Sequence, residues 1–414
     1  MEFNAETKRK LREEYDACVK RGLKLDMSRG KPGSEQLALS EGMLTALSSG
    51  EDCAAGRAAD YRNYGLVEGI PEMRELIAEL MDVQPQNVIA GGNSSLNMMY
   101  DTISAAMLFG LPGSEKPWGK YDKISFLCVV PGYDRHFAVT ERMGINMINV
   151  PLLADGPDMD AVESLVAADD TIKGIWCVPK YSNPDGVTYS DEVVRRMAAL
   201  KPAASDFRIF WDNAYALHDW YEQGDSLLNI IVETEKAGNP DMVFEFMSTS
   251  KVTFPGSGVA AVISSPANIA FLKKCMFYQT IGPDKLNQLR HVKFFGTADN
   301  LRRHMRRHAD IIRPKFEYVL DKFKQELTGV AEWNVPRGGY FISLNVPDGC
   351  AARTVELLAG AGVKMTSAGS CFPYGKDPRD RNIRIAPTYP SMDELMQATD
   401  LICLCAKLAA AEKA

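Results

Sequence analysis

The stretch MVFEFMSTSKVTFPGSGVAAVIS, residues 242–264, joins two apolar segments through a polar turn that contains one lysine. The segments, 242–248 and 258–264, each have the length and apolar composition of a buried strand. The turn places Ser248, Ser250 and Lys251 at the end of the first strand. Strands that are apolar on both faces are typical of a sheet covered by helices on both sides. We therefore expect a covered sheet whose edge carries hydroxyls and an amine.

Similar short apolar segments occur through the middle of the chain and alternate with helical patterns. We expect five further strands, at 87–92, 123–130, 146–152, 174–179 and 208–213, and helices at 94–108 and 191–200. This alternation is typical of an α/β protein with a mostly parallel sheet. Residues 266–325 have the pattern of long helices, and the stretch from about residue 335 has that of a smaller α/β unit.

Composition excludes several classes of protein. The 414 residues are 46% hydrophobic and 24% charged, with a net charge of −7, which excludes a disordered chain and gives no overall attraction to nucleic acid. No segment approaches the roughly 18 consecutive apolar residues of a membrane span. The charged N-terminus lacks the apolar core of a signal peptide. Nine scattered cysteines are typical of reduced thiols, so we expect a cytoplasmic protein without membrane or nucleic-acid partners.

A carboxylate and a phenol follow the strand expected at 208–213. Asp212 ends this strand, where open α/β sheets bind their ligands, and Tyr215 follows three residues later. A carboxylate there can keep a heteroaromatic ring nitrogen protonated, as pyridoxal phosphate (PLP) chemistry requires. Lys251 could form a Schiff base with the same cofactor while the neighbouring serines hold its phosphate. The alternatives are a helix N-cap for Asp212 and a solvated surface position for Lys251.

Three further motifs are compatible with such a site. Gly91-Gly92-Asn93-Ser94-Ser95 precedes a helix, whose free N–H groups and serines suit a phosphate. Tyr181-Ser-Asn183-Pro-Asp-Gly186 follows another strand and could be an ordinary turn. In Asn382-Ile-Arg384-Ile, an arginine within an apolar strand needs a carboxylate partner, which could be a substrate or a structural ion pair.

In their order and spacing these motifs resemble those of fold-type I, PLP-dependent aminotransferases of the class I/II superfamily. The resemblance covers about residues 20 to 410 and includes Tyr64-Gly-Leu-Val-Glu-Gly-Ile-Pro-Glu-Met-Arg74. It is strongest to an aspartate aminotransferase-like subgroup, through Gly30-Lys-Pro32, the Asn-Pro-Asp-Gly turn and the motif around Lys251. It implies a large domain with a mostly parallel sheet and a smaller α/β domain built from both chain ends. The domains would be a joining N-terminal segment at 1–50, a large PLP-binding domain at 51–300 and a small domain at 301–414.

The resemblance also implies roles for individual residues. Lys251 would be the Schiff-base lysine, Asp212 would pair with the pyridinium nitrogen, and Tyr215 with Asn183 would contact the ring oxygen. Tyr133 would stack on the ring. The phosphate would be bound by Asn93, Ser94, Ser95, Ser248 and Ser250. Tyr64 would reach the phosphate of a neighbouring subunit, which implies a homodimer with shared active sites. Arg384, with Asn183 and Gly30, would hold the substrate carboxylate.

Together these features predict amino-group transfer between an amino acid and a 2-oxo acid. The resemblance to the subgroup alone implies that these are aspartate and 2-oxoglutarate. The alternatives are a PLP-dependent β-eliminating lyase and an aminotransferase for aromatic or other amino acids. Arg29, Lys31 and Arg290 are candidates for binding a side-chain carboxylate.

One position departs from the family pattern, and one pair of histidines has the spacing of metal ligands. The family usually has an arginine after the Pro-Gly turn, to neutralise the phosphate, but Gly258 occupies that place. His304 and His308 have helical metal-ligand spacing, but arginines surround them and no third ligand is apparent, so we expect no metal site.

Overall fold

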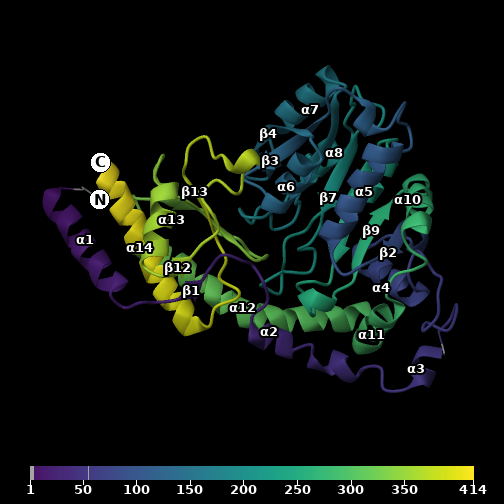
Figure 1. Ribbon diagram of the computed structural model, residues 1–414, viewed down its shortest axis with the longest axis horizontal. Coiled ribbons are helices and arrows are strands. Elements are labelled where there is room, and N and C mark those ends of the chain that lie inside the picture. The colour runs from purple at the N-terminus through teal and green to yellow at the C-terminus, as the bar shows by residue number, and fades with distance from the viewer. Residues whose placement is uncertain (1–3, 55) are drawn as a thin grey trace.

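A central eight-stranded sheet forms the larger of two lobes in the computed structural model, which describes residues 4–54 and 56–414 (Figure 1). Its strands lie in the order β2-β9-β8-β7-β6-β3-β4-β5. Their bounds are β2 (Val88–Ala90), β3 (Ser125–Val130), β4 (Asn146–Leu153), β5 (Gly156–Pro157), β6 (Ile172–Cys177), β7 (Arg208–Asp212), β8 (Val243–Ser248) and β9 (Ala260–Ser264). The seven strands predicted between residues 87 and 265 are all present. The two-residue strand β5 was not predicted.

The interior of this sheet is parallel, and this brings the chemistry-bearing residues to one edge. Strands β4, β3, β6, β7 and β8 run in the same direction, whereas β9, β2 and β5 are antiparallel to their neighbours. Asp212 is the last residue of β7 and lies opposite Phe246 of β8, two residues before Ser248. The aspartate and the serine therefore emerge side by side at the carboxyl ends of adjacent strands, as the sequence predicts.

Helices cover both faces of the sheet. Buried side chains of α5 (Ser95–Phe109), α6 (Asp134–Arg142) and α10 (Pro266–Gln279) pack with Phe210 and Phe244 on one face. Ile209 and Trp211 face the other side, because neighbouring residues of a strand alternate. The helices packed there are α4 (Pro71–Met81), α7 (Met159–Ala168), α8 (Asp191–Ala198), α9 (Ile230–Lys236) and α11 (Lys285–Phe295).

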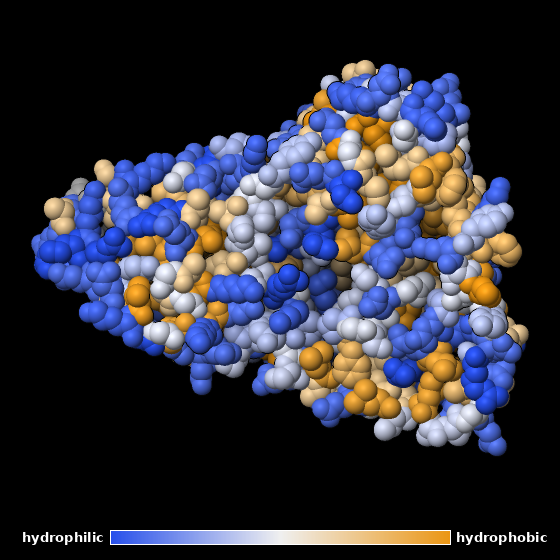
Figure 2. Space-filling view, in the orientation of Figure 1, coloured by the Kyte–Doolittle hydropathy of each residue, from blue (hydrophilic) through white to orange (hydrophobic). Residues whose placement is uncertain are grey.

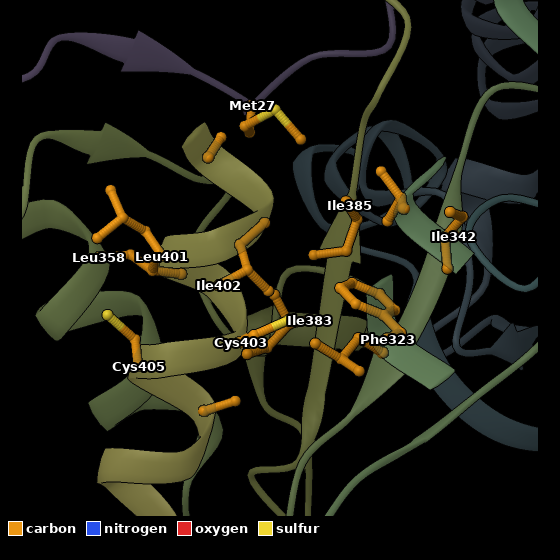
Figure 3. Packing of buried hydrophobic residues seen from close by; sticks show 14 of the residues in the cluster. Met27, Phe323, Ile342, Leu358, Ile383, Ile385, Leu401, Ile402, Cys403 and Cys405 are labelled. Carbon is orange, nitrogen blue, oxygen red and sulfur yellow. The ribbon is translucent and has the colours of Figure 1, made fainter. Parts of the chain in front are cut away.

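The smaller lobe joins the two ends of the chain. Strands β10 (Glu332–Trp333), β11 (Ile342–Asn345) and β13 (Asn382–Ile385) form an antiparallel sheet, and β1 (Leu25–Asp26) pairs with β12 (Val363–Lys364). Figure 3 shows its core, where Ile383 and Ile385 of β13 lie against Ile402 of α14 (Met392–Lys413). The helices α1 (Ala5–Val19) and α13 (Ala351–Gly360) pack on the same core. This arrangement of strands and helices matches the smaller α/β unit predicted from about residue 335.

One long helix connects the lobes. α12 (Ala298–Glu326) extends along both of them in Figure 1, and its buried residues contribute to cores in each. The boundary expected at residue 301 lies inside this helix, and the division into domains stays a prediction. The remaining short helices are α2 (Ser34–Ala38), α3 (Gly50–Ala54) and the 3-10 turns Glu41–Thr45, Pro85–Asn87, Trp118–Lys120, Pro255–Ser257 and Pro373–Gly375. None of the described helices is long and apolar enough to cross a membrane.

Candidate active site

A cavity of about 790 Å³ brings together most of the residues that the sequence singled out. Figure 2 shows the corresponding hollow between the lobes, where hydrophilic residues predominate. Eleven of the predicted residues line the cavity: Gly30, Ser94, Ser95, Tyr133, Asn183, Asp212, Tyr215, Ser248, Ser250, Lys251 and Arg384. Two do not. The carbonyl of Asn93 accepts a hydrogen bond from the Ser250 hydroxyl at 3.1 Å, and Tyr64 is 78% exposed and lies outside the cavity.

Asp212 is a buried carboxylate with one oxygen bound and the other free. His136 Nε2 donates to Asp212 Oδ2 at 3.0 Å, and the imidazole stacks on Trp176 with ring centroids 4.2 Å apart. Asp212 Oδ1 is buried without a hydrogen-bond partner among the described residues. Such an atom is costly unless a donor reaches it. The carboxylate is therefore held in place from one side and can accept a proton donor from the other.

Lys251 lies in the same cavity. Its ammonium is 4.9 Å from the centroid of the Tyr215 ring. Burial lowers the pKa of Lys251, and the negative charge of Asp212 opposes this shift. Burial also raises the pKa of Tyr133 to about 12 and that of Tyr215 well above its usual value, so both phenols stay protonated. A lysine with a lowered pKa is more often a free amine, which is the form that attacks carbonyl groups.

A cluster of hydroxyls and amides forms another part of the cavity wall. The Ser248 hydroxyl donates to that of Ser250 at 3.1 Å. Ser94 is the N-cap of α5, and its side chain makes no capping bond. The helix therefore begins with free N–H groups beside the hydroxyls of Ser95, Ser248 and Ser250. This is a favourable arrangement for a phosphate or another anion.

Gly258 is packed against this cluster. A Cβ atom added there would lie 3.0 Å from the carbonyl oxygen of Asn93 and 3.2 Å from the amide nitrogen of Ser250. These are backbone atoms, which cannot move aside as a flexible side chain would. The close approach of the chain at this point leaves no room for the arginine that the family usually places there.

Arg384 extends from the small lobe into the cavity. It donates to Asp134 Oδ1 at 2.8 Å and to Asn183 Oδ1 at 3.4 Å, and its guanidinium lies 4.9 Å from the centroid of the Phe341 ring. Its Nε has no partner among the described residues. A side chain at Gly30 would overlap the Phe341 ring, so this glycine lets the N-terminal loop lie close to the arginine.

The cavity carries more cations than Arg384 alone. Arg29 and Lys31, both predicted candidates, line it, together with Arg135 and Lys364, which the sequence analysis did not consider. Arg290 is not among the lining residues. The acidic groups that line the cavity are Asp134 and Asp212. The site is therefore suited to an anionic ligand.

Comparison with known proteins identifies the family. The family model described as "Aspartate amino-transferase" matches residues 2–414. The chain belongs to the aspartate aminotransferase family. An aspartate aminotransferase of Corynebacterium glutamicum is 45% identical over 412 residues, which cover 99% of this chain and 94% of that protein. This chain is an aminotransferase.

Solved structures agree with this assignment. An aspartate transaminase from C. glutamicum has a TM-score of 0.95 and 44% identity, with 98% of this chain and 96% of that chain covered. The α-aminoadipate aminotransferase LysN of Thermus thermophilus, solved with N-(5'-phosphopyridoxyl)-L-leucine, has a TM-score of 0.76 and 20% identity, covering 94% and 95% of the two chains. The fold is that of fold-type I aminotransferases, as the sequence predicts.

Several residues of this aminotransferase's site were missed. His136, Asp134 and Phe341 contact the predicted residues but were not identified as site residues. His136 and Asp134 are adjacent to Tyr133 at the start of α6, and this proximity was a usable signal. Phe341 could not have been found in this way, because only the pairing of β11 with β13 brings it to Arg384.

All five histidines of this aminotransferase are buried. Two of them, His304 and His308, lie with their Nε2 atoms 3.0 Å apart, and His304 Nε2 is 2.9 Å from the carbonyl oxygen of Val252. His291 Nδ1 donates to the carbonyl of Asn287 at 2.8 Å. Burial lowers the pKa of His291 to about 4 and that of His308 to about 3. Both rings are therefore neutral in the folded protein at neutral pH.

These shifts predict acid sensitivity. An unfolded histidine has a pKa of about 6.5, so the unfolded chain binds more protons than the folded one between about pH 6.5 and pH 4. Stability is fully present above this range and decreases as the pH falls. At pH 5 we expect each of the two histidines to have reduced the free energy of unfolding by about 2 kcal/mol.

Urea unfolding of the wild type and of His291→Asn at pH 7 and pH 5 measures this effect. The variant should be less stable at pH 7 but should lose about 2 kcal/mol less on acidification. An equal loss in both proteins would mean that His291 is already protonated in the folded state.

Proposed function

We propose that this aminotransferase binds PLP and transfers an amino group between aspartate and 2-oxoglutarate. The observation that carries the proposal is the unpartnered, buried Oδ1 of Asp212 in the same cavity as the Lys251 amine. A carboxylate with a free buried oxygen suits a protonated pyridine nitrogen, and a buried amine suits an aldehyde.

The other residues of the cavity fit the same cofactor. Ser94, Ser95, Ser248, Ser250 and the first N–H groups of α5 would bind the phosphate, with the carbonyl of Asn93 orienting Ser250. Tyr133 would stack on the ring, and Tyr215 with Asn183 would donate to the ring oxygen. With Gly258 in place of an arginine, the helix N-terminus and the hydroxyls would supply most of the phosphate contacts from this chain.

Bound there, PLP would supply an aldehyde that condenses with amines and a ring that accepts an electron pair. Lys251 would be the residue linked to this aldehyde until an amino acid replaces it. The released Nζ, with its pKa lowered by burial, would then remove the proton from the α-carbon of the substrate. Asp212, held by His136, would keep the ring nitrogen protonated.

Arg384 would bind the α-carboxylate of the substrate. Its present partner Asp134 is partly exposed, so an incoming carboxylate can compete for the same N–H groups. Gly30 and Asn183 lie beside it. Arg29, Lys31, Arg135 and Lys364 provide more positive charge than one carboxylate needs, which favours a dicarboxylic amino acid such as aspartate over an aromatic one.

We also propose that the protein is a homodimer with shared active sites, in the reducing cytoplasm. All nine cysteines are free. Large apolar side chains of α5 and α10 are exposed, among them Leu108, Phe109 and Phe277, and Figure 2 shows apolar surface over this region. Exposed apolar patches of this kind are typical of protein interfaces. Tyr64 is exposed as well and would reach the phosphate site of the partner.

The first test is the visible absorbance of the purified protein before and after addition of aspartate, without an oxo acid. We expect a band from the lysine-linked cofactor, which aspartate converts to the absorbance of the amino form. The Lys251→Ala variant should bind PLP without forming this band and should have no measurable turnover. A colourless protein that gains no band with PLP would contradict the cofactor assignment. A band that aspartate leaves unchanged would contradict the substrate. Release of ammonia with pyruvate from an amino acid that carries a leaving group on its β-carbon would favour the lyase.

The Arg384→Gln variant tests the carboxylate site. Loss of a charge-assisted contact should raise the KM for aspartate roughly 10- to 100-fold and leave the cofactor band in place. Arg379→Gln is the matched control, because this arginine lies in the preceding loop, is exposed and pairs with Asp348 at the surface. An unchanged KM in Arg384→Gln would place the substrate carboxylate elsewhere.

Light scattering tests the dimer. The wild type should have twice the chain mass of 45.7 kDa, and Phe277→Asp should shift it toward the monomer, because a charge replaces an apolar contact. Val335→Asp is the control, since Val335 is equally exposed but lies in the small lobe. A wild type of single-chain mass at micromolar concentration would contradict the dimer.

A further inference from the structure

The turn that carries Lys251 is held from behind by a buried polar network. We call residues 249–253 the lysine turn. The hydroxyls of Thr249 and Thr253 both lie 3.0 Å from His291 Nε2. Because His291 Nδ1 donates to the carbonyl of Asn287, its Nε2 carries no proton and accepts from these hydroxyls. This side of the turn is therefore fixed within the large lobe.

The carbonyl groups of the turn are bound from another direction. The Tyr340 hydroxyl donates to the carbonyl of Lys251 at 3.3 Å. His304 Nε2 lies 2.9 Å from the carbonyl oxygen of Val252, and His308 Nε2 lies 3.0 Å from His304 Nε2. Tyr340 immediately precedes Phe341 of the cavity wall, and the two histidines are one turn apart on α12. The backbone at the lysine therefore depends on side chains from outside the sheet.

Gln36 joins both of these contacts. This side chain is fully buried in α2. Its amide nitrogen donates to Tyr340 Oη at 2.8 Å and to His308 Nδ1 at 3.1 Å, and its Oε1 accepts from the Gly33 amide at 3.1 Å. Both N–H groups of the Gln36 side chain therefore donate hydrogen bonds. The Gly33 bond also fixes which end of the amide is the donor.

This arrangement sets the direction of the bonds that Tyr340 and His308 make. Because Tyr340 Oη accepts from Gln36, its own proton is free to go to the carbonyl of Lys251. Because His308 Nδ1 accepts from Gln36, the proton of this neutral ring lies on Nε2, toward His304. One glutamine therefore orients the Tyr340 hydroxyl on the carbonyl of Lys251 and sets the tautomer of His308 behind the turn.

The other end of the network reaches the cavity. Gly33 lies two residues after Lys31, and Ser28, Arg29, Gly30 and Lys31 all line the cavity. The carbonyl of Lys31 accepts from the Thr388 hydroxyl, which attaches this segment to the small lobe. A continuous series of hydrogen bonds thus runs from the segment beside the substrate site to the backbone of Lys251.

We propose that Gln36 is a positioning residue that couples the cavity segment 28–33 to the lysine turn. Its amide transmits the position of this segment to the Lys251 carbonyl through the Tyr340 hydroxyl. The inference deepens the proposed function, since Lys251 is the residue assigned the chemistry there. It identifies a residue that touches neither substrate nor cofactor but sets the geometry of the lysine.

Gln36→Glu is a near-isosteric probe of this role. A glutamate has the same shape but supplies at most one proton in place of two, and none when ionised. The Tyr340 hydroxyl would then donate to the new carboxyl group instead of to Lys251. Gln36→Met, which keeps the length and removes every polar contact, gives a second variant if the buried carboxyl group prevents folding.

Hydrogen–deuterium exchange of the full-length protein measures the coupling directly. We expect amide exchange across the lysine turn to be roughly three- to tenfold faster in Gln36→Glu or Gln36→Met than in the wild type. Coupling is reciprocal, so Tyr340→Phe should in turn speed exchange across residues 33–40. The double variant of Gln36→Glu and Tyr340→Phe should show less than the product of the two single effects at the lysine turn.

Asn268→Asp is the matched control. Asn268 is also a fully buried amide, but it binds Ser264 and the carbonyl of Asp241 at the opposite end of the sheet. Its replacement should leave exchange at the lysine turn unchanged. Unchanged exchange at the turn in the folded Gln36 variants, or an equal increase in Asn268→Asp, would overturn the proposal.

Kinetics with aspartate give a second readout. Tyr340→Phe should lower kcat several-fold and leave KM unchanged, because the hydroxyl orients the lysine and does not contact the cavity. A change in KM alone would contradict a positioning role. The exchange result does not depend on which amino acid is the substrate, so failure of the proposed function and failure of this coupling are separate outcomes.

Discussion

The site depends on a carboxylate that is buried at the end of a parallel strand and bound on one side only. Asp212 can be kept there because His136 donates to one oxygen and Trp176 supports the imidazole. Removing water from a carboxylate is costly, so the remaining oxygen creates a strong demand for a cationic donor. The hydroxyls of Ser248 and Ser250 and the amine of Lys251 lie on the next strand and its turn. The parallel register of β7 and β8 thus places complementary groups around one cavity.

The second requirement is that both ends of the chain meet at this cavity. Arg384 comes from β13, Phe341 from the segment before β11, and Gly30 from the N-terminal loop. Their meeting depends on the core of the small lobe, where α14 packs against the strands (Figure 3). Arg384 is therefore attached to a different hydrophobic core from Lys251. Gln36 makes contacts across this boundary, and these contacts help to fix the position of one core relative to the other.

The sequence predicts the fold and most of the site because their signals are local. Each strand of the large sheet is a short apolar segment, and Asp212, Ser248 and Lys251 directly follow such segments. Contacts between distant segments give no such signal. The stacking of His136 on Trp176 arises only when α6 folds onto the large sheet, and the pairing of Asp134 with Arg384 only when the two lobes meet. The close approach of Gly258 to the backbone of Asn93 and Ser250 disfavours a side chain there, and this crowding leaves no signal in the sequence.

The complete burial of the histidines also affects how the protein meets its surroundings. Imidazole is the side chain that ordinarily titrates near neutral pH, and across the described residues none lies on the surface. The carboxyl groups of Asp185 and Glu245, whose pKa values burial raises to about 6 and about 7, are in the interior as well. Proton uptake in this range is therefore an internal event. The charge pattern that the outer surface presents to salts, metabolites and other macromolecules is therefore nearly the same at mildly acidic pH as at neutral pH.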